Sequence, residues 1–160
     1  MQSRPLQQED ALAVWEINEE GLPGTGKVSV EEISYLIEIS EISIGIFVQD
    51  VLVGFVICLS PKLDYGSLNY AWFNEKYDDF IYVDRIAVST KHRGRGIGSS
   101  IYQELFKISK QKRIPIAAEV NSEPPNPGSI KFHQRLNFLE VGSLKHDEKS
   151  VIMFLRKFQS

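Results

Sequence analysis

The spacing of apolar residues in the first third of the chain predicts an edge strand, two helices and a hairpin. Residues 7–19 and Val30–Ile39 carry apolar side chains three or four positions apart, which is the period of an amphipathic helix. The glycine- and proline-rich residues 21–29 between them predict a loop. Residues 43–48 and Val51–Leu59 are β-rich runs on either side of a short polar turn, so they predict a hairpin, and residues 1–5 predict an edge strand.

The rest of the chain alternates β-rich runs with helical patterns. Ile81–Val88 predicts a strand, a polar and basic turn follows, and apolar residues spaced about 3.6 apart predict a helix over residues 97–110. Residues 114–120 predict a strand, and residues 129–136 predict a short helix. Residues 138–144 and 150–158 predict the two strands of a final hairpin. The aromatic-rich residues 61–79 show no clear period, and we predict a long irregular segment there.

The predicted order is β-α-α-β-β-β-α-β-α-β-β, without an internal repeat or a linker. Helices interspersed with strands indicate an α/β or α+β sandwich built on a mixed sheet, in one domain over residues 1–160. The strand–turn–helix–strand unit that begins at Ile81 should be a right-handed crossover between parallel strands.

Composition and charge narrow the classes of partner. The net charge of −3 argues against sequence-independent nucleic-acid binding, and the basic cluster around Arg93 indicates a small anion instead. No apolar run approaches the roughly 20 residues that span a bilayer, and the N-terminus lacks the apolar core of a signal peptide, so we expect no membrane partner and a cytoplasmic location. The single cysteine, Cys58, lies in an apolar run and should be buried and inert, and the histidines lack the spacing of metal ligands.

Residues 21–27, GLPGTGK, match the phosphate-loop pattern but not its physical requirements. The next residue is Val28, so the hydroxyl that would hold Mg²⁺ is missing. The preceding segment is charged and helical in pattern rather than a buried strand. We therefore interpret this segment as a loop between two helices that could lie near a substrate.

Residues 93–98, RGRGIG, have the flanks that an anion-binding turn requires. Glycines at 94, 96 and 98 let the backbone close around a bulky anion, and the arginines at 93 and 95 can form charge-assisted hydrogen bonds with phosphate oxygens. The start of the following helix adds partial positive charge. The alternative is a glycine-rich turn that binds no ligand.

This turn resembles the pyrophosphate-binding motif of the GCN5-related N-acetyltransferase (GNAT) superfamily. A second motif agrees with it: residues 126–142 are similar to the family's Asn, Phe-Tyr, Leu-Gly-Phe and Val-Gly pattern. The opening Arg4-Pro5-Leu6 is also similar to that of family members, so the resemblance spans nearly the whole chain. Within the family, the chain resembles a bacterial subgroup of acetyltransferases whose substrate is not assigned.

The resemblance implies a GNAT-like fold with a mixed, mostly antiparallel sheet of about seven strands flanked by about four helices. It implies acetyl-CoA as donor, with no metal. The pantetheine arm would pair with the strand edge formed by Ile86, Ala87 and Val88. The pyrophosphate would lie on the turn, which consists of Arg93, Gly94, Arg95, Gly96, Ile97, Gly98 and Ser99. The channel of the arm would be lined by Asn126, Ser129 and Phe132.

The resemblance leaves the catalytic residues open. A base is useful because a free alkyl amine is mostly protonated near neutral pH, and Glu119 and Asp84 are the candidates. Their alternatives are a structural ion pair for Glu119 and a pair with Arg85 or a loop N–H for Asp84. His133 stands where the family often has a tyrosine that protonates the leaving thiolate. It is either that proton donor or a packing residue.

The acceptor is the least determined part of the function. We expect Tyr70, Trp72 and Tyr82 to contact a small amine or amino acid, since carboxylates among aromatic residues suit a cation. The aromatic segment could equally be a satellite core under a long loop. The expected reaction is direct acetyl transfer in a ternary complex. The rivals are a non-catalytic CoA-binding module and a protein or peptide acetyltransferase, and a homodimer is a possible assembly.

Overall fold

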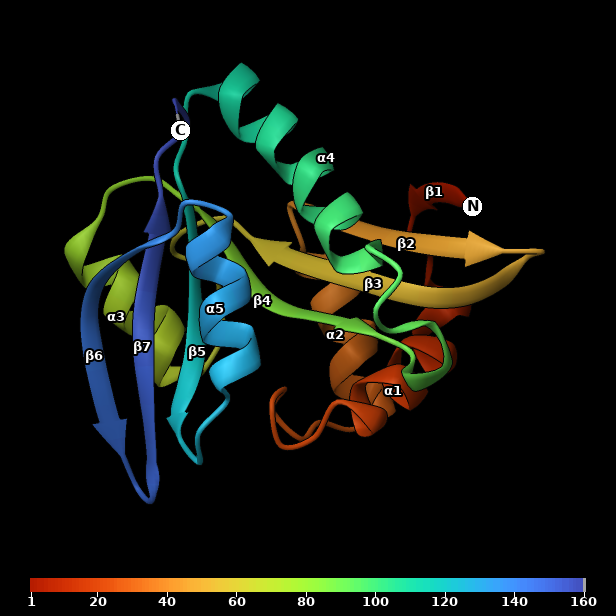
Figure 1. Ribbon diagram of the computed structural model, residues 1–160, viewed down its shortest axis with the longest axis horizontal. Coiled ribbons are helices and arrows are strands. Elements are labelled where there is room, and N and C mark those ends of the chain that lie inside the picture. Colours follow the sequence, from red (N-terminus) through yellow and green to blue (C-terminus); the bar gives the residue numbers. More distant parts are fainter. Residues whose placement is uncertain (160) are drawn as a thin grey trace. The chain divides into compact units, whose positions relative to one another are not determined.

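The seven strands form one mixed sheet in the order β1-β2-β3-β4-β5-β7-β6 (Figure 1). The computed structural model describes residues 1–159. This sheet and its covering helices confirm the predicted fold class. The strands are β1 (Gln2–Pro5), β2 (Ile42–Val48), β3 (Val51–Leu59), β4 (Ile81–Val88), β5 (Ile116–Glu123), β6 (Leu139–His146) and β7 (Lys149–Arg156), and the α-helices are α1 (Ala11–Glu20), α2 (Val30–Ile39), α3 (Leu68–Lys76), α4 (Ile97–Lys112) and α5 (Pro127–Arg135).

Strand pairing follows from local chain chemistry. β2 and β3 are antiparallel, and Gln49 and Asp50 between them have φ values of 50° and 66°, which a tight two-residue hairpin turn requires. β4 and β5 are parallel, with Ile81 opposite Ile116, so the predicted parallel pairing of the strands before and after α4 is confirmed. β5 with β7 and β6 with β7 are antiparallel. The sheet is therefore mixed and mostly antiparallel in its paired strands.

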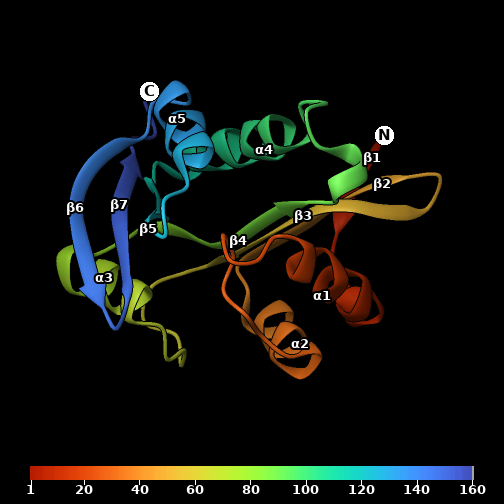
Figure 2. The same cartoon turned by 60° about the horizontal axis from the view of Figure 1, so that its bottom comes forward.

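The chain divides into two compact units, which share β4. The first contains Met1–Leu59 and Asp84–Lys107. Within it, α1 and α2 cover one face of β2 and β3, and α4 covers the other face (Figure 2). Ser29 caps α2 by accepting a hydrogen bond from the backbone N–H of Glu32, whose side chain returns to Ser29. Cys58 is fully buried, as predicted, and burial raises the pKa of its thiol, which favours the unreactive thiol form.

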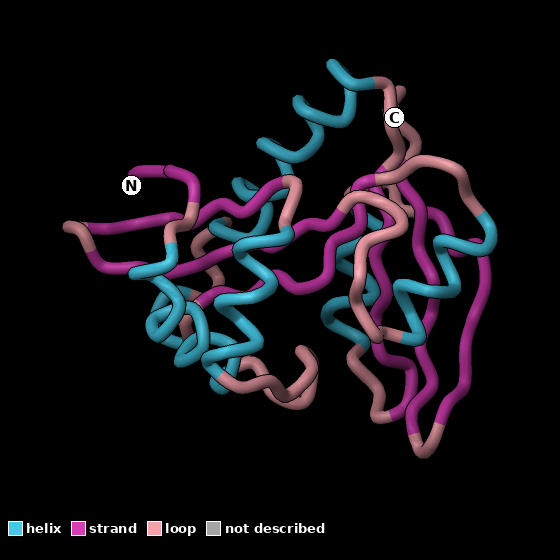
Figure 3. Tube along the Cα trace, turned by 180° about the vertical axis from the view of Figure 1, so that it is seen from behind, coloured by secondary structure: helices cyan, strands magenta, loops and turns pink. Residues whose placement is uncertain are grey.

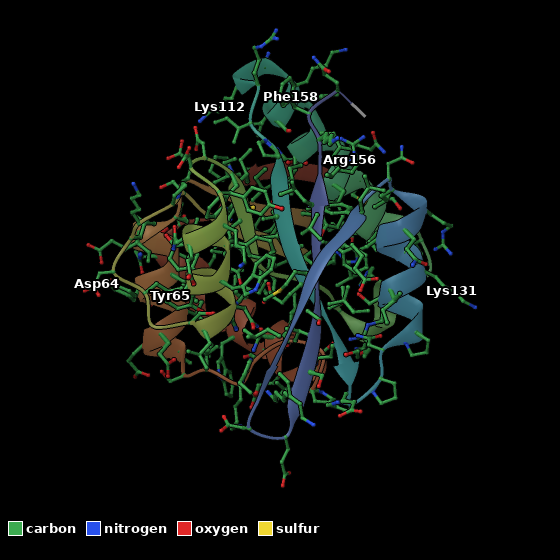
Figure 4. All side chains as sticks on the ribbon, turned by 90° about the vertical axis from the view of Figure 1, so that its left-hand side faces the viewer. Asp64, Tyr65, Lys112, Lys131, Arg156 and Phe158 are labelled. Atoms are coloured by element: carbon green, nitrogen blue, oxygen red, sulfur yellow. The ribbon has the colours of Figure 1, made fainter. Side chains whose placement is uncertain are left out.

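The second unit contains Ser60–Val83 and the residues from Ile108 onward. Within it, α3 and α5 lie on opposite sides of β5, β6 and β7 (Figure 4). The helix α5 begins at Pro127 and is followed by Asn137 with φ of 70°. Asparagine tolerates this left-handed conformation, so it can stand where the family's Leu-Gly-Phe pattern has glycine. The prediction of one domain over residues 1–160 stays a prediction.

The prediction that residues 61–79 are irregular is wrong over Leu68–Lys76, which form α3. Ser67 begins this helix by accepting a hydrogen bond from the backbone N–H of Tyr70 at 3.2 Å. The chain therefore has one helix more than predicted, inserted between β3 and β4. Tyr70 and Phe73 are buried on one side of the helix while Leu68 is 59% exposed, so the tertiary contacts of its aromatic residues stabilise a helix that the apolar period did not reveal.

The helices of residues 1–159 include none whose length and apolar character would suit a membrane span.

Candidate active site

The turn before α4 has the backbone conformation that the glycine pattern predicts. Gly94 and Gly96 have φ values of +78° and +77°, in the left-handed region that favours glycine. A Cβ built on either residue meets nothing within 4 Å, so both backbones border open space. The residues from Arg93 to Gly96 are exposed. Because the first N–H groups of a helix have no partner within the helix, Ile97, Gly98 and Ser99 direct backbone donors toward this turn.

Arg93 forms hydrogen bonds within the protein that hold the turn in place. Its Nε donates to the carbonyl of Val88 and its Nη2 to the carbonyl of Glu20, each at 3.2 Å. The Glu20 carboxylate in turn accepts from the backbone N–H and the hydroxyl of Thr90, at 2.7 and 2.9 Å, and these bonds hold the pKa of Glu20 below its usual range. The end of α1 therefore fixes the turn, and Arg95 is exposed on it.

The strand that leads into the turn lies beside β3. The N–H of Ser89 donates to the carbonyl of Val53 at 2.8 Å, directly after the half-buried residues Ile86, Ala87 and Val88. A Cβ built on Gly54 would lie 3.0 Å from Cγ2 of Ile97, so glycine allows the first residue of α4 to pack closely on the strand. Ile97 is buried, and it can present only its backbone to a ligand at the turn.

The predicted residues of the second motif form the start of α5. Asn126 is the N-cap, and its Oδ1 accepts from the backbone N–H of Ser129 at 3.4 Å. The carbonyl of Ser129 lies 2.8 Å from Nδ1 of His133, and Phe132 is half-buried with its ring at right angles to the His133 ring. Asn126, Ser129 and Phe132 thus stand on consecutive turns at one end of a helix.

His133 lies in an apolar environment. It is 4% exposed, and its ring stacks on Phe154 at 5.9 Å and meets Phe138 edge-on at 5.1 Å. Burial lowers the pKa of His133, so the imidazole is neutral near pH 7. A backbone carbonyl can only accept a hydrogen bond, so Nδ1 of His133 carries the hydrogen in its bond to the carbonyl of Ser129. Of the two alternatives for His133, this geometry favours packing.

Asp84 is engaged in a buried ion pair within the first unit. Its Oδ2 lies 2.7 Å from Nε of Arg85, and the two side chains are 3% and 5% exposed. The same guanidinium donates through Nη1 to Oδ1 of Asn18 and to the carbonyl of Gly26, each at 3.1 Å. The structural alternative for Asp84 is therefore the one that the geometry supports. The loop between α1 and α2, visible in Figure 3, is a loop as predicted, and Arg85 anchors it.

Glu119 has different surroundings in the second unit. Its Oε1 accepts hydrogen bonds from the hydroxyl of Tyr82 at 2.8 Å and from Nδ2 of Asn69 at 3.2 Å. Both donors are neutral, and each favours the ionised carboxylate over the carboxylic acid. Oε1 thus accepts from two neutral donors, whereas Asp84 is in an ion pair, and the ionised carboxylate is the form of Glu119 that can accept a proton.

Sequence reasoning missed Asn69 and His146, which complete this cluster. Nε2 of His146, at the end of β6, lies 3.2 Å from Oδ1 of Asn69. Asn69 belongs to α3, in the segment that we expected to be irregular, and His146 is 77 residues away along the chain. No local pattern joins residues so distant, although the N-cap at Ser67 is a signal that could have placed Asn69 on a helix.

Two of the predicted acceptor contacts have structural partners. The Tyr70 hydroxyl donates to the carbonyl of Ser60 at 2.5 Å and accepts from the N–H of Leu63 at 2.8 Å, so it fastens the loop before α3. Trp72 is half-buried and packs against Gly142, where a Cβ would lie 2.5 Å from Cζ2 of the indole. This geometry favours the satellite core for Tyr70 and Trp72. Tyr82 alone among the predicted aromatic contacts bonds to Glu119.

No group of three or more His, Cys, Asp or Glu side chains among residues 1–159 is arranged to hold a metal ion.

Comparison with known proteins places these motifs in a family. The model of the acetyltransferase (GNAT) family matches residues 11–138. A curated relative from Bacillus subtilis (strain 168), named "Putative acetyltransferase YjbC", is 35% identical over 83 residues. That match covers 52% of this chain and 40% of the relative, so the chain matches less than half of the relative's length.

Two solved structures share the fold over almost the whole chain. The ribosomal-protein-S18-alanine N-acetyltransferase from Escherichia coli superposes with a TM-score of 0.75 at 13% identity, covering 98% of this chain and 93% of that one. Arabidopsis thaliana NAA60, in complex with a bisubstrate analogue, superposes with a TM-score of 0.76 at 18% identity, covering 98% and 97%. At such identities the likeness concerns the fold.

The family match extends from the first residue of α1, through the glycine turn before α4, to the residues that follow α5. It therefore includes the glycine turn and residues 126–138 of the second motif. The chain belongs to the acetyltransferase (GNAT) family.

Proposed function

We propose that the protein is an acetyl-CoA-dependent N-acetyltransferase. In this proposal the acetyl group passes to the amine of a small molecule or amino acid by direct attack in a ternary complex. Family membership supports acetyl transfer to an amine, and the site residues support the roles that follow.

The turn before α4 is the observation that carries the proposal. Gly94 and Gly96 leave open space where any side chain would project, and the start of a helix of 16 residues follows at once. A pyrophosphate suits this place, because backbone donors and the helix dipole both favour an anion there. Arg95 is exposed on the same turn and adds positive charge. The residues present therefore fit the pyrophosphate of acetyl-CoA.

Residues before and after the turn along the chain are proposed to complete the donor site. The half-buried strand residues Ile86, Ala87 and Val88 can offer backbone groups to the amides of the pantetheine arm, as a strand edge does to a peptide. Asn126, Ser129 and Phe132 at the start of α5 are proposed to line the channel of the arm.

Glu119 is the proposed general base. Bound acetyl-CoA would supply an activated thioester carbonyl. Glu119 accepts a proton from the acceptor ammonium, directly or through one water, and so provides the neutral amine that attacks. The Tyr82 hydroxyl, 2.8 Å from Oε1, and the amide of Asn69 hold the carboxylate ionised and oriented. Asp84 is bound to Arg85, so Glu119 is the better of the two candidates.

Acetylation of a protein or peptide amine is the second candidate. The fold is similar to that of the E. coli ribosomal-protein-S18-alanine N-acetyltransferase, and two structures in this fold group carry such a name, from E. coli and Brucella melitensis. We prefer a small amine, because the hydrogen-bonded polar groups around Glu119 form a compact cluster.

The test is thiol release from acetyl-CoA across a panel of small amines, amino acids and peptides with an N-terminal alanine, beside calorimetric titration with acetyl-CoA. We expect binding of acetyl-CoA together with turnover of at least one amine or amino acid. Turnover confined to peptides would replace the first candidate by the second.

Two results would contradict the proposal more deeply. Binding of acetyl-CoA without turnover on any member of the panel would indicate a CoA-binding module that is not an enzyme. The absence of any binding would contradict the assignment of the turn. A control titration with free CoA and with dephospho-CoA separates recognition of the pyrophosphate from that of the 3′-phosphate.

A further inference from the structure

Asn69 connects Glu119 to a histidine near the surface through consecutive hydrogen bonds. Its Nδ2 lies 3.2 Å from Oε1 of Glu119, and its Oδ1 lies 3.2 Å from Nε2 of His146. The three residues come from α3, β5 and β6, all within the second unit. Asn69 and His146 are both half-buried. The chain of contacts therefore runs from the proposed base toward the end of β6.

Only one assignment of donors satisfies the whole chain when Glu119 is ionised. A carboxylate accepts hydrogen bonds and cannot donate them, so the amide nitrogen of Asn69 must face Glu119. The amide oxygen then faces His146, and Nε2 of His146 must carry a hydrogen. The opposite orientation of the amide would place two acceptors, Oδ1 and Oε1, against each other. Glu119 thus fixes the orientation of the Asn69 amide, and a hydrogen on Nε2 of His146 supports that same orientation.

We propose that Asn69 is a positioning residue for Glu119, and that His146 acts through it by holding its amide in the donating orientation. This inference rests on the proposed function in taking Glu119 as the base. Loss of the Asn69 amide removes a donor that stabilises the ionised form, so Glu119 would take up a proton at higher pH.

The groups that face Glu119 come from β4, β7, α3 and β6. On β4 the facing titratable group is Tyr82, which donates to the same oxygen. On β7 the residue opposite Glu119 is Met153, which carries no charge. From α3 the facing group is Asn69 itself, and from β6 it is His146, through Asn69. Tyr82 and Asn69 are thus two neutral donors that stabilise the carboxylate.

The test is a pH titration of the Glu119 carboxyl carbon by NMR in protein labelled with ¹³C at the glutamate side chains. The Glu119→Gln variant identifies the resonance by its disappearance. We expect the midpoint to rise by about one pH unit in Asn69→Ala, since a hydrogen bond to a charged group is lost. It should rise further in Asn69→Asp, where a second carboxylate replaces the donor. Unchanged midpoints in both variants would overturn the proposal.

Matched controls separate positioning from packing. Asn74 is a second asparagine of α3, and its Oδ1 accepts from the backbone N–H of Lys62 at 2.9 Å, so Asn74→Ala removes an equivalent amide from the same helix. We expect it to leave the Glu119 midpoint unchanged. His146→Ala should raise the midpoint less than Asn69→Ala does, and His146→Gln should restore it because its amide can still donate. If Asn74→Ala raised the Glu119 midpoint as much as Asn69→Ala does, the shift would reflect general packing of α3, and the proposal for Asn69 would be overturned.

Kinetics distinguish failure of this inference from failure of the proposed function. In Asn69→Ala the acidic limb of the pH profile of kcat/KM should move to higher pH by the same shift as the NMR midpoint, with KM for acetyl-CoA unchanged. A wild-type protein without turnover on any amine contradicts the proposed function, and the NMR titration then still accepts or overturns the role of Asn69. A wild-type protein with turnover, whose limb is unmoved in Asn69→Ala, overturns the inference alone.

Discussion

Nε of Arg85 lies 2.7 Å from Oδ2 of Asp84, the residue that precedes it on β4, and both side chains are almost fully buried. Adjacent residues of a strand normally direct their side chains to opposite faces, so this pair requires the arginine to bend back toward its neighbour. Arg85 reaches Asn18 and Gly26 with the same guanidinium. The pair therefore connects β4 to the loop after α1.

Removal of one partner should reveal this connection in the free energy of unfolding. Arg85→Met leaves the Asp84 carboxylate buried without its cation, and we expect a loss of about 3–5 kcal/mol. Asp84→Asn should lower the free energy of unfolding as well, and the double variant should be less destabilised than the sum of the two by about 1–3 kcal/mol. Urea denaturation of the three variants measures this. Strictly additive effects would show that the pair is not coupled.

The glycine turn gives a prediction for binding of the donor. Gly96→Asp places a carboxylate where the backbone borders open space, so it should abolish binding of acetyl-CoA measured by calorimetry. Gly96→Ala is the matched control, because it adds the strain of a side chain at φ of +77°, about 1–2 kcal/mol, without the charge. We expect Gly96→Ala to bind with moderately reduced affinity. Equal affinity of Gly96→Asp and the wild type would contradict the phosphate site.

Replacement of the proposed base should affect turnover rather than binding. Glu119→Gln keeps an oxygen that can accept from Tyr82 but cannot take up a proton, so kcat should fall by about 10²–10⁴-fold with little change in the affinity for acetyl-CoA. Tyr82→Phe removes one donor to Oε1 and should lower kcat by a smaller factor. Steady-state kinetics with calorimetry provide the measurement. If Asp84→Asn reduced kcat as strongly as Glu119→Gln in folded protein, the assignment of the base would be wrong.

The buried histidine predicts a pH dependence of stability. Burial lowers the pKa of His133 below its usual 6.5, so below about pH 6.5 the unfolded chain binds a proton that the folded chain does not. The contribution of His133 to the free energy of unfolding should therefore fall as the pH falls from 6.5 to the folded value, and should be constant above 6.5. Denaturation at pH 5, 6, 7 and 8, values that bracket the usual pKa of histidine, measures it.

His133→Phe keeps an aromatic ring against Phe154 and removes the titrating group, so this part of the pH dependence should disappear. His92→Gln, in the turn before α4, should retain it. His133→Phe also tests the alternative role of His133 as a proton donor, because loss of a proton donor would reduce kcat by about 10²-fold or more. We expect kcat of His133→Phe to stay within a few-fold of the wild type.

The local parts of the fold and of the site were predictable from sequence. β-rich apolar runs located β3 and β4, and the helical period located α2, at their observed bounds, and the glycine spacing placed the turn before α4. α3 was missed because its buried residues, Tyr70 and Phe73, share the helix with exposed and half-buried apolar residues. Asn69 and His146 could not be found, since their role depends on strands that meet only in the folded chain.

The contact between Trp72 and Gly142 joins residues far apart in the sequence, and substitutions at both positions can test it. The indole lies so close to the Gly142 backbone that a Cβ there would be 2.5 Å from Cζ2 and 2.9 Å from Cη2, both atoms of a rigid ring. The register of β6 with β7 already shifts between Glu140 and Gly142. If β6 moved away from the indole at Gly142, it would lose further hydrogen-bonded pairing with β7. Gly142→Ala should therefore lower the free energy of unfolding by about 1–3 kcal/mol. Gly142→Ala combined with Trp72→Leu should lose less than the sum of the two single variants, because the smaller side chain frees the space. Additive losses in urea denaturation would mean that the alanine is accommodated elsewhere and that the indole does not limit residue 142.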